Sequence, residues 1–351
     1  MMDEKDWFLR EIIKMRKPRE HGHLVEEEDA GILRLYKGIA KFFGEIDMEL
    51  FVCDTYAKES CTITSEQGTV LLYDKYLTGT LNVLNLLYFQ DGCPEDVRKY
   101  CCRLMAESYF SLGRYEGALF MVSQYVERPG YHMHKTGDER DRRAAGCAAM
   151  QQFMVISHEI GHWFLQGRDD RKEILESQKK FLGEIFQYGS DGIMKRKFRQ
   201  EIWDKDTIAE ECFCDYVAVQ VLLEMFLDSC PIHSIMEAAF LTSQHLEVLA
   251  AVEAFVEEGK YRRTDNLLQS AVRMVYLRFV LTELVADIIG GGRKQEIFHE
   301  LGEIYEGYRS MVYHPATEVI TEVGPECSEF MFRTEGSVTK EMVDGLIGQL
   351  I

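Results

Sequence analysis

The segment His158-Glu159-Ile160-Gly161-His162 constrains the fold of this chain more than any other feature of its sequence. On a helix, residues four positions apart share one face, so the two imidazoles can converge on one metal ion. Six apolar residues flank the segment: Phe153, Met154, Ile156, Trp163, Phe164 and Leu165. They predict a buried helix. Because buried imidazoles need a partner to offset their desolvation, a zinc site is favoured over two incidental histidines.

Two residues inside this segment have predicted roles of their own. Glu159 follows the first histidine and can reach a water on the open side of the metal, where it would serve as general base. Gly161 has no side chain and leaves room for another backbone to approach the helix closely.

A third zinc ligand is predicted from a second helix, because catalytic zinc usually takes three protein ligands plus water. Glu211 and Asp215 are four positions apart and share a helix face, and an apolar run over 217–223 follows them. We therefore expect Glu211 to bind the zinc and Asp215 to accept the distal N–H of a ligating histidine. Glu210 is the neighbouring alternative, but it points about 100° away around the helix. An acidic first turn of the helix also explains Glu210.

Together these elements resemble the gluzincin zinc metallopeptidases. The segment 211–218 is most similar to the Glu-x-x-Ala-Asp-x-x-Ala helix of the HtpX and CAAX-prenyl-protease kind, with Cys214 where that group usually has Ala. More loosely, the motifs resemble soluble regulatory peptidases of the ImmA/IrrE kind, which cut transcriptional repressors. The stretch between His162 and Glu211 is charged and helical in pattern, whereas the resembling membrane peptidases have integral membrane helices.

A segment near the C-terminus, Tyr313-His314-Pro315, is similar to the Ser/Thr-His-Pro segment of the same group. The histidine there stabilises the tetrahedral oxyanion, so the resemblance implies that role for His314. Tyr313 is a second candidate donor, and His245 is a weaker alternative. This chain lacks the Arg that usually follows the segment. A helix stop with an incidental histidine explains the His-Pro pair equally well.

Strand patterns occur in one stretch ahead of the zinc helix. Residues 50–54, 60–64 and 69–74 form short runs rich in apolar or β-branched residues, and 65–68 supplies turn residues between the last two. We expect a small antiparallel sheet. In the resembling peptidases an edge strand pairs with the substrate backbone. The segment that begins at residue 51 resembles that strand loosely.

The rest of the chain has helical periodicity, so the expected fold class is α+β and predominantly helical, with added helices around the sheet. The resemblance implies a zincin-like (minigluzincin) core. Three regions are expected: N-terminal helices over 1–48, the catalytic core with helical insertions over 49–226, and a C-terminal helical region over 227–351 that packs on the core.

Composition excludes several classes of protein. The chain has 40 Lys and Arg against 59 Asp and Glu, a formal net charge of −19, which repels nucleic-acid phosphates. No apolar run approaches the roughly 18–20 residues of a membrane span. The first 20 residues lack the apolar stretch of a secretory signal, and the ten cysteines show no disulfide framework. We expect a cytoplasmic protein.

The sequence therefore predicts a zinc metallopeptidase that acts on a protein or peptide. The alternative is a non-catalytic zinc-binding regulatory or interaction protein on a zincin scaffold, which a closed site with Cys214 as fourth ligand would favour. Two loop histidines, His132 and His134, are more simply read as solvated than as a second metal pair. Substrate specificity and oligomeric state leave no signature in the sequence.

Overall fold

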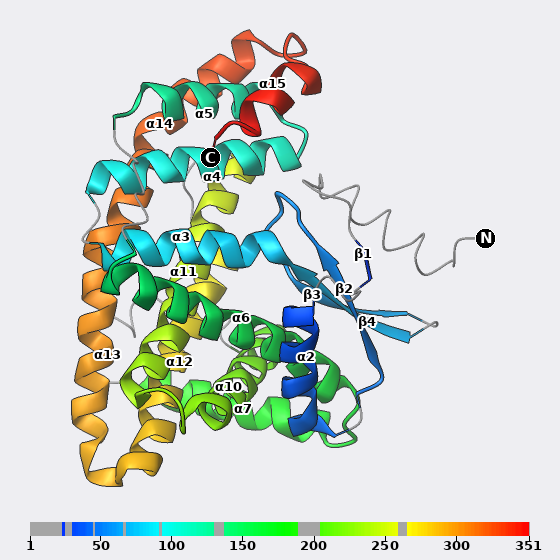
Figure 1. The fold of residues 1–351 in the computed structure, drawn as a ribbon, viewed down its shortest axis with the longest axis vertical. Coiled ribbons are helices and arrows are strands. Elements are labelled where there is room, and N and C mark those ends of the chain that lie inside the picture. Colours follow the sequence, from blue (N-terminus) through cyan, green and yellow to red (C-terminus); the bar gives the residue numbers. More distant parts are fainter. Residues whose placement is uncertain are drawn as a thin grey trace.

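The computed structural model describes residues 23–24, 30–44, 46–65, 68–90, 93–129, 137–188, 204–258 and 265–350. The predicted helix over 3–16 and the pair His132 and His134 lie outside these residues. Over the described residues the chain is predominantly helical with one small sheet, in agreement with the expected α+β class. The sheet stands at one side of the helical body, as Figure 1 shows.

In the part of the chain that the structure describes, the sheet has four strands: β1 (His23–Leu24), β2 (Met48–Cys53), β3 (Cys61–Ser65) and β4 (Gly68–Asp74). Their order is β1-β2-β4-β3. The three predicted strands are confirmed, but the purely antiparallel sheet is wrong, because β2 pairs with β4 in parallel. The hairpin of β3 and β4 is antiparallel, as its short turn predicts. Turn residues determine only the pairing of the two strands that they connect. The position of β4 between β2 and β3 depends on contacts between residues farther apart in the chain.

Successive side chains along each strand point to opposite faces of the sheet, and both faces are buried. Leu50 and Leu71 belong to the apolar cluster that the sheet shares with the helices, whereas Phe51 and Leu72 belong to a separate cluster. This period of two is what an extended strand imposes on successive side chains. The sheet therefore packs on the helical body through one face.

The connection between β2 and β3 passes the C-terminal end of β4. Thr55 donates to the Asp74 carboxylate from its backbone N–H at 3.2 Å and from its hydroxyl at 2.5 Å. The same carboxylate accepts from the Tyr76 N–H at 2.9 Å and so caps the next helix. Asp74 thus holds together the sheet, the connection 54–60 and the first helix behind them.

The helices occupy most of the expected ranges. Their bounds are α2 (Ala30–Phe43), α3 (Lys75–Phe89), α4 (Pro94–Ser111), α5 (Tyr115–Glu127), α6 (Glu139–Gln166), α7 (Arg171–Tyr188), α10 (Asp206–Phe226), α11 (Ile232–Glu258), α12 (Asp265–Ile289), α13 (Lys294–Tyr308), α14 (His314–Arg333) and α15 (Lys340–Ile347). Short helical turns at Gly291–Arg293 and Arg309–Tyr313 flank α13. The predicted helix stop at His314-Pro315 is wrong: the helical path continues into α14, where Pro315 occupies the first turn, which tolerates proline.

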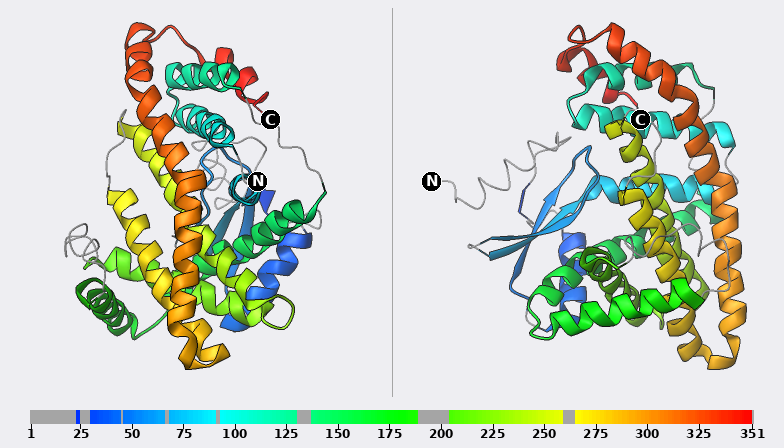
Figure 2. Two further views of the ribbon diagram at one scale, coloured as in Figure 1. Left: turned by 90° about the vertical axis from the view of Figure 1, so that its left-hand side faces the viewer. Right: turned by 180° about the vertical axis from the view of Figure 1, so that it is seen from behind.

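The main apolar core joins helices from both halves of the chain. Buried side chains of α3, α4, α6 and α11 through α14 belong to one cluster. In Figure 1 and in the right view of Figure 2, α13 runs along the side of the molecule opposite the sheet. Among the described helices, α11 alone is long and apolar enough to cross a membrane, and 72% of its most apolar window is buried inside the protein. Burial in the core accounts for that composition equally well.

Candidate metal centre

Helix α6 carries both histidines of the motif on one face. Asp138 caps its start by accepting hydrogen bonds from the N–H groups of Arg140 and Asp141 at 2.9 and 3.1 Å. His158 and His162 lie one turn apart, with ring centroids 5.0 Å from each other and ring planes at 80°. The helical spacing therefore presents two imidazoles side by side, as predicted.

Helix α10 crosses α6 at Gly161. A Cβ atom added there would lie 3.2 Å from Cys214 Cα and 3.3 Å from its Sγ, which is tighter than ordinary packing. The predicted close approach of a second backbone is thus confirmed. It brings the acidic residues of α10 to the histidines.

Replacing Gly161 by Ala is expected to destabilise the protein by about 1–3 kcal/mol, because the added methyl group forces two helix backbones apart. Gly146 on the same helix is the matched control, since it is exposed and has open space around it. Gly146→Ala is expected to stabilise by about 0.5–1 kcal/mol through helix propensity. Urea unfolding of both variants measures the difference; equal effects would contradict the tight crossing.

Glu211 lies between the two imidazoles, as the sequence predicts. Its Oε2 is 3.3 Å from His158 Nε2, and its Oε1 is 3.5 Å from His162 Nε2. Two nitrogens and a carboxylate from separate helices thus converge within one small volume. Imidazole nitrogens and a carboxylate oxygen are donor types that zinc accepts.

Both outward-facing ring nitrogens have acidic partners. His158 Nδ1 lies 2.9 Å from Asp215 Oδ1, so the predicted partners are adjacent, but the contact does not have the geometry of a hydrogen bond. His162 Nδ1 lies 3.1 Å from Glu210 Oε1, and Arg171 donates to the other oxygen of Glu210 at 2.8 Å. Glu210 thus pairs with Nδ1 of His162, whereas Glu211 faces Nε2, and Glu210 lies beyond the first turn of α10. The Glu210 carboxylate therefore orients the His162 ring through Nδ1.

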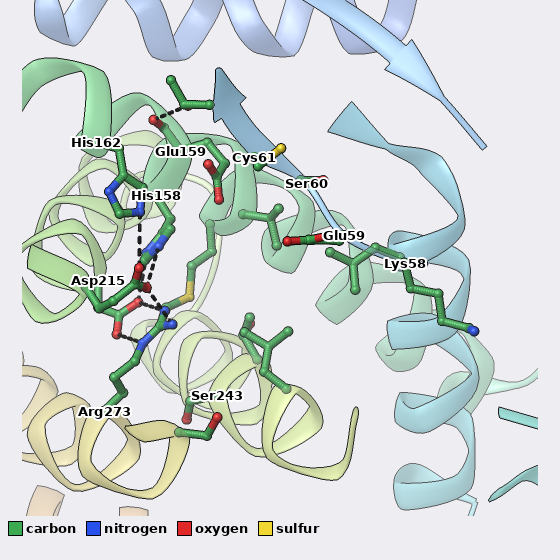
Figure 3. A pocket seen from close by; sticks show the side chains of 18 of the residues that line it. Lys58, Glu59, Ser60, Cys61, His158, Glu159, His162, Asp215, Ser243 and Arg273 are labelled. Carbon is green, nitrogen blue, oxygen red and sulfur yellow. Dashed lines mark hydrogen bonds and ion pairs between the residues drawn. The ribbon is translucent and has the colours of Figure 1, made fainter. Parts of the chain in front are cut away.

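Arg273 of α12 was not singled out from the sequence. Its guanidinium donates to both oxygens of Asp215 at 2.8 and 2.7 Å, and it lies 2.7 Å from Glu211 Oε2. Figure 3 shows it reaching into the site beside Asp215. The sequence feature that could have identified Arg273 is its position between two apolar residues, Val272 and Met274. Such a position predicts a buried guanidinium, which needs a carboxylate partner.

The charges of the site perturb several pKa values. Burial opposes ionisation of Glu211, but Arg273 and the histidines outweigh it and hold the pKa of that carboxyl well below its usual range. Burial also disfavours the charged form of His158, yet the contacts with Asp215 and Glu211 raise the pKa of His158 to about 10. Burial raises the pKa of Glu159.

Zinc binding at pH 7 is expected to release about one proton, because His158 carries a proton that the metal must displace. Since the pKa of His158 in the metal-free protein is about 10, apparent zinc affinity should rise about tenfold per pH unit between pH 6 and 8. Titration calorimetry in buffers of different ionisation enthalpy counts the released proton. A binding enthalpy independent of the buffer would contradict this protonation state.

Cys214 offers a second way to complete the site. A metal ion can be held by His158, His162 and Cys214, whose donor atoms lie within 4.8 Å of one another. Burial raises the pKa of the Cys214 thiol well above its usual value, and the neighbouring carboxylates add to that shift. Only the thiolate binds metal strongly. Metal binding through Cys214 would therefore have to displace the thiol proton.

The histidines open onto a cavity of about 420 Å³. Figure 3 shows His158, Asp215 and Arg273 on one side of it and Cys61 on the strand side. The Thr62 hydroxyl of β3 donates to the Glu159 carbonyl at 2.8 Å and holds this strand against α6. The edge strand next to the site is therefore β3, and the assignment to the segment from residue 51 is wrong, because β2 lies inside the sheet.

The structure does not bring Tyr313 and His314 to the cavity. Neither residue lines it. Tyr313 is buried under the Arg309 guanidinium, and His314 is exposed where α14 begins. His245 is also elsewhere, because its ring nitrogens lie 2.7 Å from Tyr308 Oη and from an Asn85 oxygen in the core. The oxyanion role predicted for Tyr313 and His314 therefore has no support in the geometry.

Comparisons with known protein families, curated proteins and solved structures find no match to this chain.

Proposed function

We propose that this protein is a zinc-dependent peptidase whose metal ligands are His158, His162 and Glu211. The observation that carries the proposal is the convergence of two imidazole Nε2 atoms on one carboxylate from another helix, at 3.3 and 3.5 Å. Such a donor set fits zinc. When bound, zinc would polarise the substrate carbonyl and lower the pKa of the attacking water. This arrangement is also what the gluzincin resemblance implies.

Glu159 is the general base in this proposal. It is only 9% exposed, lines the cavity, and follows His158 directly on α6. Its raised pKa suits a group that takes a proton from water and then donates it. Glu159 accepts the proton as the water oxygen bonds to the carbonyl carbon. It passes that proton to the leaving amine as the C–N bond breaks.

The other charged residues keep these groups in position. Glu210 orients the His162 ring through Nδ1, and Asp215 lies 2.9 Å from His158 Nδ1 as a charge partner, so that both Nε2 atoms would face the metal. Arg273 pairs with both Glu211 and Asp215. It thereby balances the two carboxylates that a buried site would otherwise hold unpaired.

Substrate access follows from the sheet. Within the described residues β3 is an edge strand that pairs with β4 on one side, and its first residues, Cys61 and Thr62, line the cavity. An extended peptide can pair with the open side of β3 and so carry a peptide bond past Glu159.

The proposal is tested with zinc-loaded protein and an unfolded substrate such as casein. We expect hydrolysis that a chelator abolishes and added zinc restores. Stoichiometric zinc without hydrolysis of casein or of a mixed peptide library would favour the second candidate, a metal-binding protein without peptidase activity. That candidate rests on the proximity of Cys214 to the histidines.

Cobalt substitution separates the two candidates independently of activity. If Cys214 ligates the metal and closes the site, the cobalt protein shows a sulfur-to-cobalt charge-transfer band. We expect no such band, because Glu211 meets both histidines. Its appearance would favour the closed, non-catalytic site.

A further inference from the structure

The connection between β2 and β3 contains a residue in a strained backbone conformation. Lys58 has a φ of 55°, and it is the one non-glycine residue with a positive φ among those that the structure describes. In this left-handed region Cβ comes too close to a carbonyl oxygen, so an L-residue there costs free energy. Such a conformation persists only where surrounding contacts impose it. The side chain of Lys58 makes contacts of that kind.

The Lys58 side chain enters the helical body and forms a buried ion pair there. Its Nζ lies 3.0 Å from Glu107 Oε2 of α4, and it donates to the Tyr56 carbonyl at 3.0 Å. Only 4% of the Lys58 side chain and 2% of the Glu107 side chain are exposed. A lysine is almost never buried to this extent without a charged partner. Figure 3 shows that Lys58 points away from the metal residues.

Glu107 is also bound by two residues of the helical body. The Arg103 guanidinium donates to Glu107 Oε1 at 2.9 Å, and the Tyr76 hydroxyl of α3 donates to the same oxygen. Burial opposes ionisation of Glu107, but Lys58 and Arg103 outweigh it and lower the pKa of that carboxyl. The carboxylate is therefore an anion that α3 and α4 hold in place, and Lys58 attaches the connection to it.

The ion pair lies at one end of a continuous part of the cavity lining. Residues 58–62 all line the cavity, and we call them the cavity wall. At the other end of this wall, Thr62 donates to the Glu159 carbonyl of α6. The cavity wall is thus attached to α4 through Lys58 and to α6 through Thr62.

A contribution to stability alone explains this ion pair poorly. Taking two charges out of water costs about as much free energy as their attraction returns, and apolar residues of similar volume often stabilise a protein equally well. An ion pair differs from such residues in that it requires one relative position of its two groups. Here that position comes with a strained backbone at Lys58, directly beside the cavity.

We infer that the Lys58–Glu107 ion pair fixes the cavity wall in the position that accepts an extended peptide. Both residues are positioning residues, because they act on the substrate through the wall. The role toward a peptide rests on the proposed peptidase, whereas the attachment of the wall rests on the contacts of Lys58 and Glu107 alone.

Hydrogen–deuterium exchange tests the attachment without any substrate. Glu107→Gln keeps the size of the side chain and removes the charge that pairs with Lys58. We expect the backbone amides of 58–62 to exchange about tenfold faster or more, because local opening becomes easier. The amides of α13, on the opposite side of the molecule, should keep their exchange rates. Unchanged exchange over 58–62 would overturn the inference.

Glu237→Gln is the matched control. Glu237 is 5% exposed, and the Arg143 guanidinium donates to both of its oxygens at 2.7 Å, so this variant also breaks a buried ion pair. Neither residue lines the cavity. Exchange over 58–62 should stay at the parent rate in this control. An equal rise in both variants would assign the effect to general destabilisation and overturn the inference.

A second variant keeps the test valid if Glu107→Gln does not fold. Lys58→Met removes the ammonium group and leaves Glu107 paired with Arg103. We expect the same rise in exchange over 58–62 as in Glu107→Gln, and no further rise when the two changes are combined, because residues that act as a pair are not additive. Additive effects would show that the two residues act separately and would overturn the inference.

Kinetics of the zinc-loaded variants test the role toward a peptide. A loosened wall must be ordered when a peptide binds, so we expect KM to rise about tenfold in Glu107→Gln and in Lys58→Met. The value of kcat and the affinity for zinc should stay within about twofold, because the ligands lie on α6 and α10. General destabilisation would instead lower kcat through the active fraction. Raised exchange with an unchanged KM would overturn the positioning role.

The two kinds of measurement separate this inference from the proposed function. If the parent protein hydrolyses no peptide, the proposed peptidase fails, and exchange over 58–62 still decides whether the ion pair fixes the wall. If the parent protein hydrolyses peptides and both variants match it in exchange and in KM, the peptidase stands and the inference fails.

Discussion

Replacing Glu159 by Gln lowers the rate of peptide hydrolysis by about 10²–10⁴-fold and leaves zinc content unchanged. The amide keeps the size of the side chain but cannot take the proton of the attacking water. Because Glu159 is a neighbour of the ligands rather than a ligand in this proposal, the metal should remain. The measurements are kcat/KM on one peptide and zinc stoichiometry of the purified variant.

Glu139→Gln is the control for this experiment, because it makes the same chemical change on the same helix at its exposed first residue. Its activity should match that of the parent protein. If the Glu159 variant retains full activity, Glu159 is not the base. If it loses zinc as well as activity, its carboxylate belongs to the metal-binding set.

Glu211→Gln is expected to weaken zinc binding by more than 100-fold, whereas Cys214→Ala leaves it nearly unchanged. A residue that only orients a ligand costs about 10–100-fold when it is replaced, so loss of a ligand should cost more. Asp215→Asn should fall in that intermediate range. Competition with a chelator of known affinity measures all three variants.

This series decides between the two ways of completing the site. A large loss in Cys214→Ala with little change in Glu211→Gln would assign the third ligand to the thiolate and contradict the proposal. Retained helical circular dichroism in each variant shows that the loss is local. The contrast is sharp because both residues lie on α10 within one turn of each other.

The strands illustrate how far the fold could be predicted. Short runs of apolar or β-branched residues, in which side chains two positions apart share a face, predict strands. The bounds predicted for β2, β3 and β4 are therefore close to those observed. The order of the strands could not be predicted, because nothing in the sequence of β2 distinguishes β4 from β3 as its partner. The pairing is settled by the connection over 54–60, which the Asp74 carboxylate holds across the end of β4.

In the candidate metal site too, local spacing could be predicted from the sequence and contacts between helices could not. His158 and His162 had to share a face on any helix, and so did Glu211 and Asp215. That the two faces meet follows from the crossing at Gly161. The partner of Glu210 could not be read from the chain, because Glu210 acts through His162, which is remote in sequence.

The failure at Tyr313 and His314 has a related cause. The resemblance carried over a short segment, but its place in space depends on the path of α13, which runs along the side away from the sheet (Figures 1 and 2). A contact between residues far apart in the chain depends on every helix packed between them. Short segments carry no record of that packing.

By itself, the sequence determined which helices carry the candidate metal ligands, because the spacing of residues around one helix is a property of the local backbone. Only the tertiary structure decided which groups act together: Arg273 with Glu211, Glu210 with His162, and Thr62 with the backbone of Glu159. These partners come from separate elements. Their meeting depends on how the apolar surfaces of α6, α10, α12 and the sheet fit together.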